Sequence, residues 1–476
     1  MFSAKNKADL TEGPIFIRML LFTLPIMVTG LLQVAYNMAD NIVVGSFSGD
    51  DLALAAVGST SSLTTVIVNL LVGVGTGAGV VVAQYFGAKD NEKLGKSVHT
   101  AITFALISGV LLSLIGLLIS APALRLIGTK EELFDRAQLY FGIICIGIPA
   151  STVYNFGNGI LRSVGNSRTP LYILSLSGLL NVVLNLFFVL VCHMKVEGVA
   201  IATIISQYVS AIAVIIFLIK QEGSPYKLNL RNLGINTAIL KRIIRFGLPA
   251  GLQGSLFGIS NLLLTSAVNT LPTAAVSAKT IAFNIDGISY TVMNSYLHSA
   301  MTFVGQNYGA RKLDRIKKSS AYAIIQVGAI GILMAAILTS LSEFIVGLYL
   351  DPSNPDKALI TELTRNLMSL ILWCYFLCGI MDTLSGILRG IGNSLAPMLI
   401  CVIGTVGIRV LWIYAFFPMQ ALNSLNGLYL CYPITWIIVN VAMIAVLLYS
   451  WRKLKRSGTF DEASKKEVST EGTTTA

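Results

Sequence analysis

Long apolar stretches separated by short polar connections run along most of this chain. A helix needs about 20 apolar residues to cross the hydrocarbon core of a bilayer, and twelve stretches are long enough. We predict membrane spans over residues 15–44, 52–84, 97–120, 134–157, 170–191, 197–219, 242–269, 276–305, 317–346, 360–388, 396–416 and 426–450. The pattern therefore predicts an all-α integral membrane protein with twelve transmembrane helices.

Composition supports the membrane class. Hydrophobic residues make up 54% of the 476 residues and charged residues only 12%, whereas a soluble domain carries about 25% charged residues. The net charge of +11 could suggest nucleic acid binding. However, 26 of the 34 lysines and arginines lie near the two chain ends or in and beside the loops that follow the even-numbered spans. Basic residues mark the cytoplasmic side, so we predict that both termini are cytoplasmic and expect no nucleic acid partner.

The chain repeats itself. Residues 159–170 and 386–397 share eight of twelve positions at an offset of 227. Two further matches have similar offsets: Phe22–Pro25 with Phe246–Pro249, and Gln84–Lys89 with Gln306–Arg311. The repeated twelve-residue stretch itself has the composition of a turn before a helix that begins near a proline, and we assign it no chemistry.

The six spans of the first half thus recur as the six spans of the second half. An even number preserves orientation, so the two copies should be parallel lobes related by a pseudo-two-fold axis along the membrane normal. The expected organisation is a cytoplasmic amino terminus (1–14), an N-lobe (15–219), a cytoplasmic linker (220–241), a C-lobe (242–450) and a cytoplasmic tail (451–476).

An acid in the first span is the strongest candidate for function. Gln33, Tyr36, Asn37 and Asp40 follow helical spacing and share one face. An ionisable side chain inside a membrane is costly, which makes it a functional hypothesis by default. The alternative is that Asp40 lies at the membrane interface. Pro25 precedes this face by fifteen residues and permits bending of the helix.

Other polar groups in the spans are weaker candidates. Asn181 and Asn185 are four residues apart on one face of the fifth span, where they could line a cavity or hold helices together. Asp382 lies four residues before the repeated turn, and its counterpart in the first half is Asn155. The sequence does not decide whether Asp286 lies at the membrane interface, nor which side chain pairs with Arg409.

Enzyme chemistry and cofactors are not expected. Leu94–Ser97 resembles half of a nucleotide-binding loop, but Asp90 stands where that motif needs glycine. The six cysteines and three histidines lack the spacing of a structural metal site. No nucleophile–base pattern stands out.

These residues resemble the multidrug and toxic compound extrusion (MATE) family of efflux transporters, most closely its MepA-like bacterial branch. The resemblance covers residues 10–454. It rests on the duplicated twelve-span layout, Tyr36-Asn37-x-x-Asp40, the pair Gln84-x-x-Gly87 and Gln306-x-x-Gly309, and the doubled Gly-Ile-Leu-Arg-x-x-Gly-Asn-Ser. The major facilitator class has two parallel halves as well, but the loop Gly87–Gly95 does not match its signature.

The resemblance implies a site and a hinge. The family's cation-binding residues match Asp40, Asn181, Asn185 and Thr203. The expected substrate cavity includes Tyr36, Asn37, Asn155 and Asp382, of which Asp382 matches the family's acid in the tenth span. Pro25 is the expected hinge of the first helix. No acid lies between Pro249 and Asn269, so a C-lobe cation site built from two acids, as in some members, is in doubt.

The implied function is cation-coupled antiport. We expect H⁺ or Na⁺ as the coupling ion, Na⁺ binding at Asp40 if sodium is used, and export of amphipathic, mostly cationic organic compounds including drugs by alternating access. The expected setting is the bacterial plasma membrane, with a monomer surrounded by lipid and no cofactor. The alternative is a flippase for a lipid or a lipid-linked saccharide.

Overall fold

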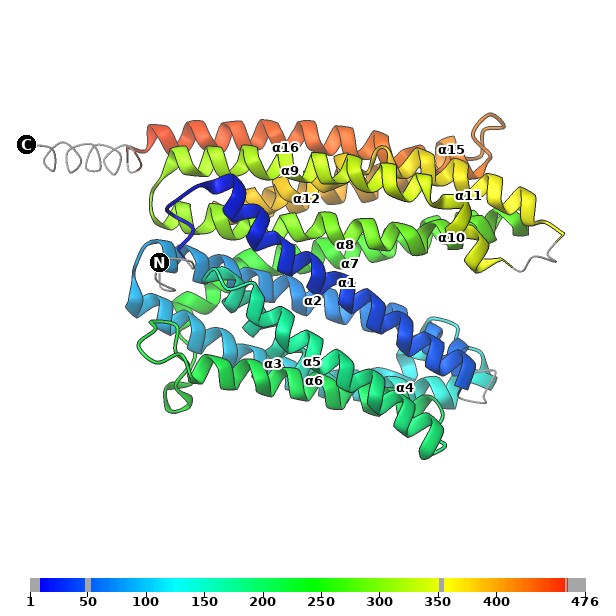
Figure 1. The fold of residues 1–476 in the computed structure, drawn as a ribbon, viewed down its shortest axis with the longest axis horizontal. Helices are drawn as coiled ribbons and strands as arrows, with labels where there is room; N and C mark the ends of the chain where they lie inside the picture. Colours follow the sequence, from blue (N-terminus) through cyan, green and yellow to red (C-terminus); the bar gives the residue numbers. More distant parts are fainter. Residues whose placement is uncertain (1–8, 48–52, 351–354, 459, 461–476) are drawn as a thin grey trace, which may run out of the picture. The chain divides into compact units, whose positions relative to one another are not determined.

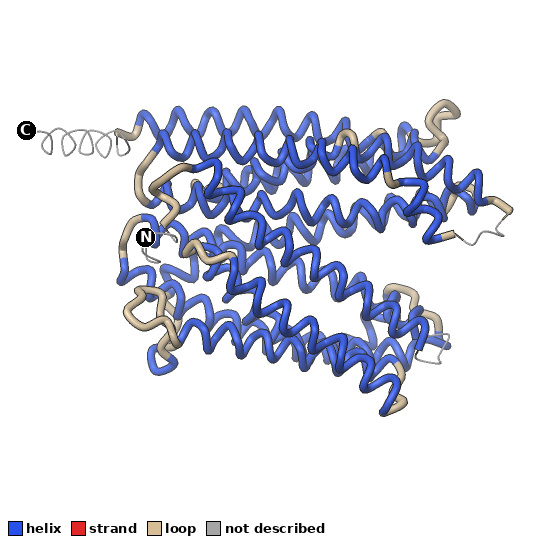
Figure 2. Tube along the Cα trace, viewed as in Figure 1, coloured by secondary structure: helices blue, strands red, loops and turns tan. Residues whose placement is uncertain are grey.

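The computed structural model describes residues 9–47, 53–350, 355–458 and 460. Helices account for nearly all of this part of the chain, and it contains no strand (Figures 1 and 2). Most of the amino terminus expected over residues 1–14, and most of the tail expected over 451–476, lie outside the described residues.

The chain forms two compact units. Unit 1 is built around Leu24–Ser255, and unit 2 contains Leu10–Thr23 together with the chain from Leu256 onward. The first helix, α1 (Ile15–Phe47), and the first helix after the linker, α7 (Thr237–Val268), each contribute to both units. Both of these helices contain a proline, Pro25 in α1 and Pro249 in α7.

Unit 1 otherwise consists of α2 (Ala53–Gly87), α3 (Asn91–Leu126), α4 (Glu131–Ser163), α5 (Arg168–Leu186) with its π-helical continuation η2 (Phe187–Val191), α6 (Val196–Ile219) and the short η3 (Leu230–Asn232). Helix α4 is at the centre of this unit, since it packs against α2, α3 and α6. The segment after α6 packs back onto α3, where the backbone N–H of Asn229 donates to His99 Nε2 at 3.0 Å.

Unit 2 consists of α8 (Thr273–Gly309), α9 (Leu313–Ser340), α10 (Ser342–Tyr349), α11 (Lys357–Leu372), α12 (Tyr375–Gly390), α13 (Leu395–Cys401), η4 (Val402–Gly407), α14 (Ile408–Leu411), η5 (Trp412–Phe416), α15 (Leu425–Tyr429) and α16 (Cys431–Arg456). Helix α12 takes the central place, packing against α8, α9 and α16. It corresponds in the repeat to α4, so the duplication extends to the packing order.

The helices confirm the predicted fold class. Within the described residues, nine helices are long and apolar enough to cross a membrane, and the pair α11–α12, bent by 40°, gives a tenth when it is counted as one span. Helices α7 and α8 are 32 and 37 residues long and less apolar. Together these twelve long stretches correspond to the twelve predicted spans. Polar residues lower the apolarity of α7 and α8, which is consistent with helices that do not face lipid on all sides.

The repeated stretch forms the predicted turn in both halves. Gly165 and Gly392 adopt positive φ values of 84° and 86°, a conformation that glycine tolerates at helix carboxyl termini. The side chains of Asn166 and Asn393 then accept hydrogen bonds from the backbone three residues later, at 3.1 and 3.2 Å. The two turns therefore have the same backbone conformation and the same capping bond.

Candidate cation and substrate site

Asp40 lies where α1 meets α5. Asn185 on α5 donates its side-chain N–H to Asp40 Oδ1 at 2.5 Å. Asn185 is fully buried, and its own Oδ1 has no hydrogen-bond partner among the described residues. An orphaned buried acceptor is unfavourable unless a donor or a cation fills the position. The pair therefore presents carboxylate and amide oxygens that can still accept a hydrogen bond or bind a cation.

A line of polar side chains extends from this pair to α6. Asn185 also lies 3.4 Å from Asn181 Oδ1, one turn earlier on α5. Asn181 in turn donates to Thr203 Oγ1 on α6 at 3.4 Å, and the Thr203 hydroxyl donates to the Val199 carbonyl at 2.9 Å. The structure thus brings together all four residues expected to form a cation site. Their role in binding remains a prediction.

The site opens into a cavity of about 600 Å³ inside unit 1. Asp40, Asn181 and Thr203 line it, together with Tyr36, Asn37 and Asn155. Within the part of the chain that the structure describes, Asp40 is the only charged residue of the lining, which is otherwise mostly hydroxyl, amide and tyrosine side chains. A volume of this size accommodates a drug-sized molecule. The lone acid gives the cavity a preference for cations.

Several lining residues were not anticipated. Thr60 and Thr64 on α2, Tyr140 on α4 and Gln207 on α6 face the same cavity. Thr60 and Thr64 are four residues apart and therefore share one helix face. The same helical spacing placed the polar residues that end at Asp40 on one face of α1. Tyr140 and Gln207 are isolated polar residues in apolar surroundings, and only the helix packing shows that they reach the cavity.

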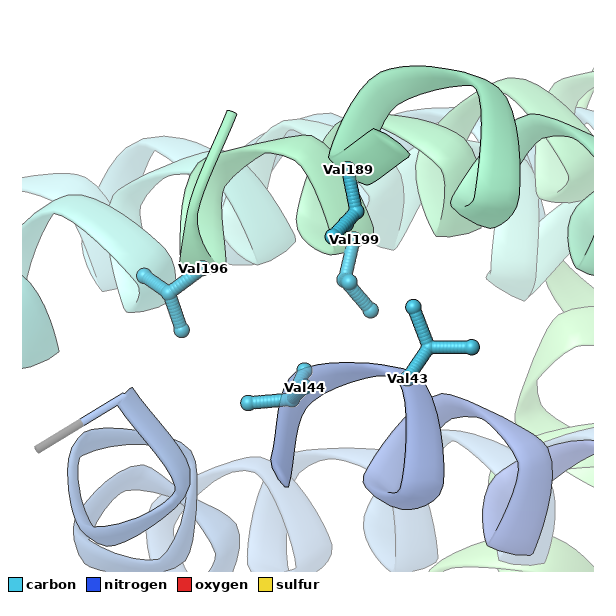
Figure 3. Close-up of a cluster of buried hydrophobic side chains, with 5 residues drawn as sticks. All are labelled: Val43, Val44, Val189, Val196 and Val199. Carbon is cyan, nitrogen blue, oxygen red and sulfur yellow. The ribbon is translucent and has the colours of Figure 1, made fainter. Parts of the chain in front are cut away.

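A cluster of buried valine side chains lies one helical turn from two of the site residues (Figure 3). Val43 and Val44 lie one turn beyond Asp40 on α1, and Val199 lies one turn before Thr203 on α6. With Val189 and Val196 they form a buried cluster against which Tyr140 packs. The cluster packs the end of α1 against η2 and α6 next to the site residues.

Close packing fixes the α1 face toward α5. A Cβ atom added to Gly178 would lie 1.9 Å from the Tyr36 ring, so only glycine leaves room for this aromatic side chain. The Tyr36 hydroxyl donates to the Ser175 carbonyl at 3.3 Å. Tyr36 therefore contacts α5 through both its ring and its hydroxyl, four residues before the acid.

Asp382 belongs to unit 2, on α12. It is 3% exposed, and Asn294 on α8 donates to its Oδ2 at 3.3 Å. The partner of Arg409 is also resolved: its guanidinium lies 3.8 Å from the centre of the Tyr432 ring and donates to Asn261 Oδ1 at 3.4 Å. Such a contact with an aromatic face compensates a buried cation. Asp286 interacts electrostatically with Arg409, and its Oδ1 has no hydrogen-bond partner among the described residues.

The chemistry of the site suits a hard monovalent cation or a proton. Its groups are a carboxylate, two amides and a hydroxyl, and oxygen ligands suit hard cations. Among the described residues, no group of three or more histidine, cysteine or acidic side chains could hold a metal ion. A proton needs only the carboxylate, whereas sodium would also use the amide and hydroxyl oxygens.

The sequence matches a family of transporters. The family model MatE covers residues 25–187 and 249–415, so the chain belongs to the MatE family, and the resemblance noted from the sequence is confirmed. The two matched segments begin at Pro25 and Pro249, the prolines that the internal repeat also aligns.

Curated relatives cover nearly the whole chain. A probable multidrug resistance protein of Bacillus subtilis, YoeA, is 26% identical over 441 residues, covering 91% of this chain and 94% of the relative. The multidrug export protein MepA of Staphylococcus aureus is 24% identical over 421 residues, covering 87% and 90%.

Solved structures show the same fold. An outward-facing multidrug resistance MATE family transporter of the MOP superfamily superposes with a TM-score of 0.85 at 23% identity, covering 95% of this chain and 99% of that one. A Pyrococcus furiosus MOP superfamily transporter, for which a reversed polarity of the binding pocket was taken to suggest a different function, superposes at 0.86 with 24% identity, covering 96% and 99%.

Proposed function

We propose that this protein is a cation-coupled multidrug exporter that moves amphipathic organic cations out of the cell by alternating access. One observation carries the proposal: a single carboxylate, Asp40, hydrogen-bonded to Asn185, at the edge of a drug-sized cavity without basic side chains. The names of the two curated relatives, which describe multidrug resistance and multidrug export, support a role in drug export.

The carboxylate supplies the coupling. A buried charge is costly without a counter-ion, and either a proton or a sodium ion bound at Asp40 removes that cost. The form of the transporter with Asp40 enclosed is therefore favoured when the site holds a cation. A ligand shifts a conformational equilibrium by its differential affinity for the two states. Inward cation flow would thereby drive export of the organic cation.

The alternative, a flippase for a lipid or lipid-linked saccharide, has less support. Such cargo carries anionic phosphate groups, and recognition of phosphate uses arginine or lysine. No such side chain is among the residues that line the cavity in the described part of unit 1.

The proposal also includes the setting. It consists of two parallel lobes over residues 15–219 and 242–450, a monomer, cytoplasmic termini and a bacterial plasma membrane. The cytoplasmic termini are supported by the basic loops of the sequence. The Pro25 helix is the proposed hinge between conformations. Asp382 is proposed to attract cationic cargo from the C-lobe.

Reconstituted vesicles test the proposal. Efflux of a fluorescent organic cation should be measured under a sodium gradient alone and a proton gradient alone, for the unmodified protein, Asp40→Asn and a control, Glu132→Gln, which removes an exposed acid at the start of α4. We expect one gradient to drive efflux by the unmodified and control proteins and neither to drive it in Asp40→Asn. Gradient-driven efflux at the normal rate by Asp40→Asn would refute the assignment.

A further inference from the structure

Arg409 is a buried cation of unit 2 that the proposed function does not use. It lies on α14, inside the eleventh predicted span, and is 5% exposed. Its guanidinium lies 3.8 Å from the centre of the Tyr432 ring on α16, and Nη1 donates to Asn261 Oδ1 on α7 at 3.4 Å. An arginine inside a membrane is costly, which makes it and its partner a functional hypothesis. Neither the ring nor the amide supplies a negative charge to balance it.

Asp286 on α8 supplies that charge. Its carboxylate interacts electrostatically with Arg409 and accepts a hydrogen bond from the hydroxyl of Tyr375, at the start of α12. Oδ1 of Asp286 is buried and has no hydrogen-bond partner among the described residues. The carboxylate is therefore compensated by the charge of Arg409 and by one neutral donor, while one of its oxygens keeps the capacity to bind a further group.

A single aromatic framework positions both charges. Trp436 on α16 is 2% exposed, and its ring centre lies 5.4 Å from those of Tyr432 and Tyr375. The rings are nearly perpendicular, at 89° and 79°, which is an arrangement that aromatic pairs prefer. Tyr432 contacts the guanidinium, and Tyr375 donates to the carboxylate. The arginine and the acid are thus held by side chains that pack on the same tryptophan.

The groups around the guanidinium would also suit a free cation. They are a carboxylate with an unpaired oxygen, the amide oxygen of Asn261, a phenol hydroxyl and the face of the Tyr432 ring. Oxygen ligands of these classes suit hard cations, and the face of an aromatic ring attracts positive charge. Carboxylate, amide and hydroxyl groups likewise surround Asp40 in unit 1.

The two acids differ in what balances their charge. Asp40 interacts with Asn185 and Thr203, which are both neutral. No lysine or arginine of the described residues lines its cavity. Asp286 instead interacts with Arg409. The charge of Asp40 therefore has to be balanced by an ion from solution, whereas that of Asp286 is balanced by the chain itself.

The internal repeat shows that this acid–base pair is confined to unit 2. At the offset of 227, Arg409 aligns with Val182. At the offset of 222, which aligns residues 84–89 with 306–311, Asp286 aligns with Thr64. Both counterparts in the first half are uncharged. The acid and the base are thus present together or absent together, as expected of a matched pair, because either one alone would be an uncompensated buried charge.

We propose that Arg409 is a built-in counter-ion that takes the place of a free cation at Asp286, and that these residues of unit 2 form a latent cation site. Asp286 then takes up no coupling ion during transport, and the net charge of the pair does not follow the ion gradient. The statement about coupling deepens the proposed function and rests on it. The latent site itself rests on contacts within unit 2. Arg409 thus determines which acids are open to the coupling ion.

Tethering gives the arginine its advantage over an ion from solution. A group attached to the same chain acts at a high effective concentration, and Arg409 is also held by the Tyr432 ring. Removal of the guanidinium would leave a buried carboxylate without its counter-ion, a strongly unfavourable state. Uptake of sodium or a proton at Asp286 relieves that state. Truncation of Arg409 should therefore turn the latent site into an active one.

Cation binding by the detergent-purified full chain provides the first test. Arg409→Ala removes the guanidinium, and radioactive sodium counts the ions bound at equilibrium. Asp286→Asn/Arg409→Ala removes both charges, and Arg409→Lys keeps a cation. Arg365→Ala is the matched control, because Arg365 pairs with Glu343 at the surface at 3.4 Å. Infrared absorption of protonated carboxyl groups, compared between the single and the double alanine variants, detects a proton that is taken up in place of sodium.

We expect Arg409→Ala to bind one more cation per protein, sodium or a proton, than the unmodified protein. The double variant, Arg409→Lys and Arg365→Ala should bind no extra cation. An unchanged count in Arg409→Ala would overturn the proposal. Loss of a bound cation in Asp286→Asn would also overturn it, since that acid would then already hold an ion. These counts do not depend on export, so a failure of ion-driven efflux in the unmodified protein would refute the proposed function alone.

Chemical rescue provides the second test. Free guanidinium, at concentrations far below those that denature proteins, should fill the space left in Arg409→Ala, raise the melting temperature of this variant and displace its extra cation. The same ion should not stabilise Asp286→Asn/Arg409→Ala, which lacks the acid. Rescue remains measurable if Arg409→Ala is unstable by itself, because the added ion should then restore folding. Equal responses of the two variants would contradict the pairing of Arg409 with Asp286.

Discussion

Asn185 and Asp40 are joined by a side-chain hydrogen bond of 2.5 Å between α5 and α1. Their sequence positions are 145 residues apart. The amide neutralises no charge, so the carboxylate keeps its capacity to take up a cation. The pair is the centre from which the following predictions are made.

Replacing the amide should change the ion dependence of efflux. Asn185→Leu removes the donor to the charged carboxylate, worth about 1.5–3 kcal/mol, and it also removes the unpaired Asn185 Oδ1. If sodium is the coupling ion, loss of this oxygen ligand should raise the sodium concentration at half-maximal efflux at least tenfold. If the proton is the coupling ion, loss of the donor should favour the protonated acid and lower the required proton concentration. The substrate affinity measured in the absence of a gradient should change little in either case. The control for the ion dependence is Asn294→Leu, which removes the amide that contacts Asp382 in unit 2. Asn166→Leu is less suitable, because it would disturb a turn. An unchanged ion dependence in Asn185→Leu would exclude this role.

Adding a methyl group at Gly178 should displace the Tyr36 ring. A Cβ atom there overlaps the tyrosine ring, and overpacking of this kind costs about 1–3 kcal/mol. Gly178→Ala should therefore melt at a lower temperature in detergent and bind substrate more weakly. Gly287→Ala serves as the control, because a Cβ atom at Gly287 meets nothing within 4 Å. Equal effects of the two substitutions would show that Tyr36 is not fixed by α5.

Truncation of the valine cluster should destabilise the protein. Val43 is 5% exposed, and removal of two buried carbon atoms costs about 2 kcal/mol once the residual cavity is counted. Thermal unfolding of Val43→Ala should show this loss. Val441→Ala removes the same atoms at a position that is 65% exposed and should leave the melting temperature nearly unchanged. If Val43→Ala melts like the unmodified protein, the cluster contributes no packing energy.

Asp90 at the start of α3 provides a pH-dependent prediction outside the membrane spans. The hydrogen bond from the Lys93 side chain, and then that from the Lys93 backbone, lower the pKa of Asp90 below its ordinary value of 3.8. A carboxylate whose pKa is depressed by folding stabilises the folded state above the unfolded-state pKa and loses that contribution as the pH falls through the folded-state pKa.

The stabilising effect of Asp90 should therefore be present at neutral pH and disappear below about pH 4. Melting curves of the unmodified protein and Asp90→Ala, recorded from pH 7 to pH 3, should differ at neutral pH and converge in acid. Because Asp90 is at the surface, the difference should be small and should shrink in high salt. A difference that is constant across this range would show that the charge does not contribute.

The sequence by itself determined the features that depend on local pattern. Apolar length determined the spans, and the offset matches revealed the duplication, since both are properties of consecutive residues. Helical spacing placed Asn181 beside Asn185 correctly, because residues four apart on a helix are neighbours in any fold. The repeated turn with Gly165 and Gly392 was predictable for the same reason.

Only the tertiary structure decided which helices bring their polar faces together. The bond between Asp40 and Asn185, the contact of Arg409 with Tyr432, and the bonds from Arg242 to Gln84 all cross between helices far apart in sequence. Such partners depend on the crossing angle and depth of packed helices, which arise from interdigitation of many side chains. No period in the sequence records that geometry, so the close crossing of α2 and α7 at their glycines is evident only in the structure.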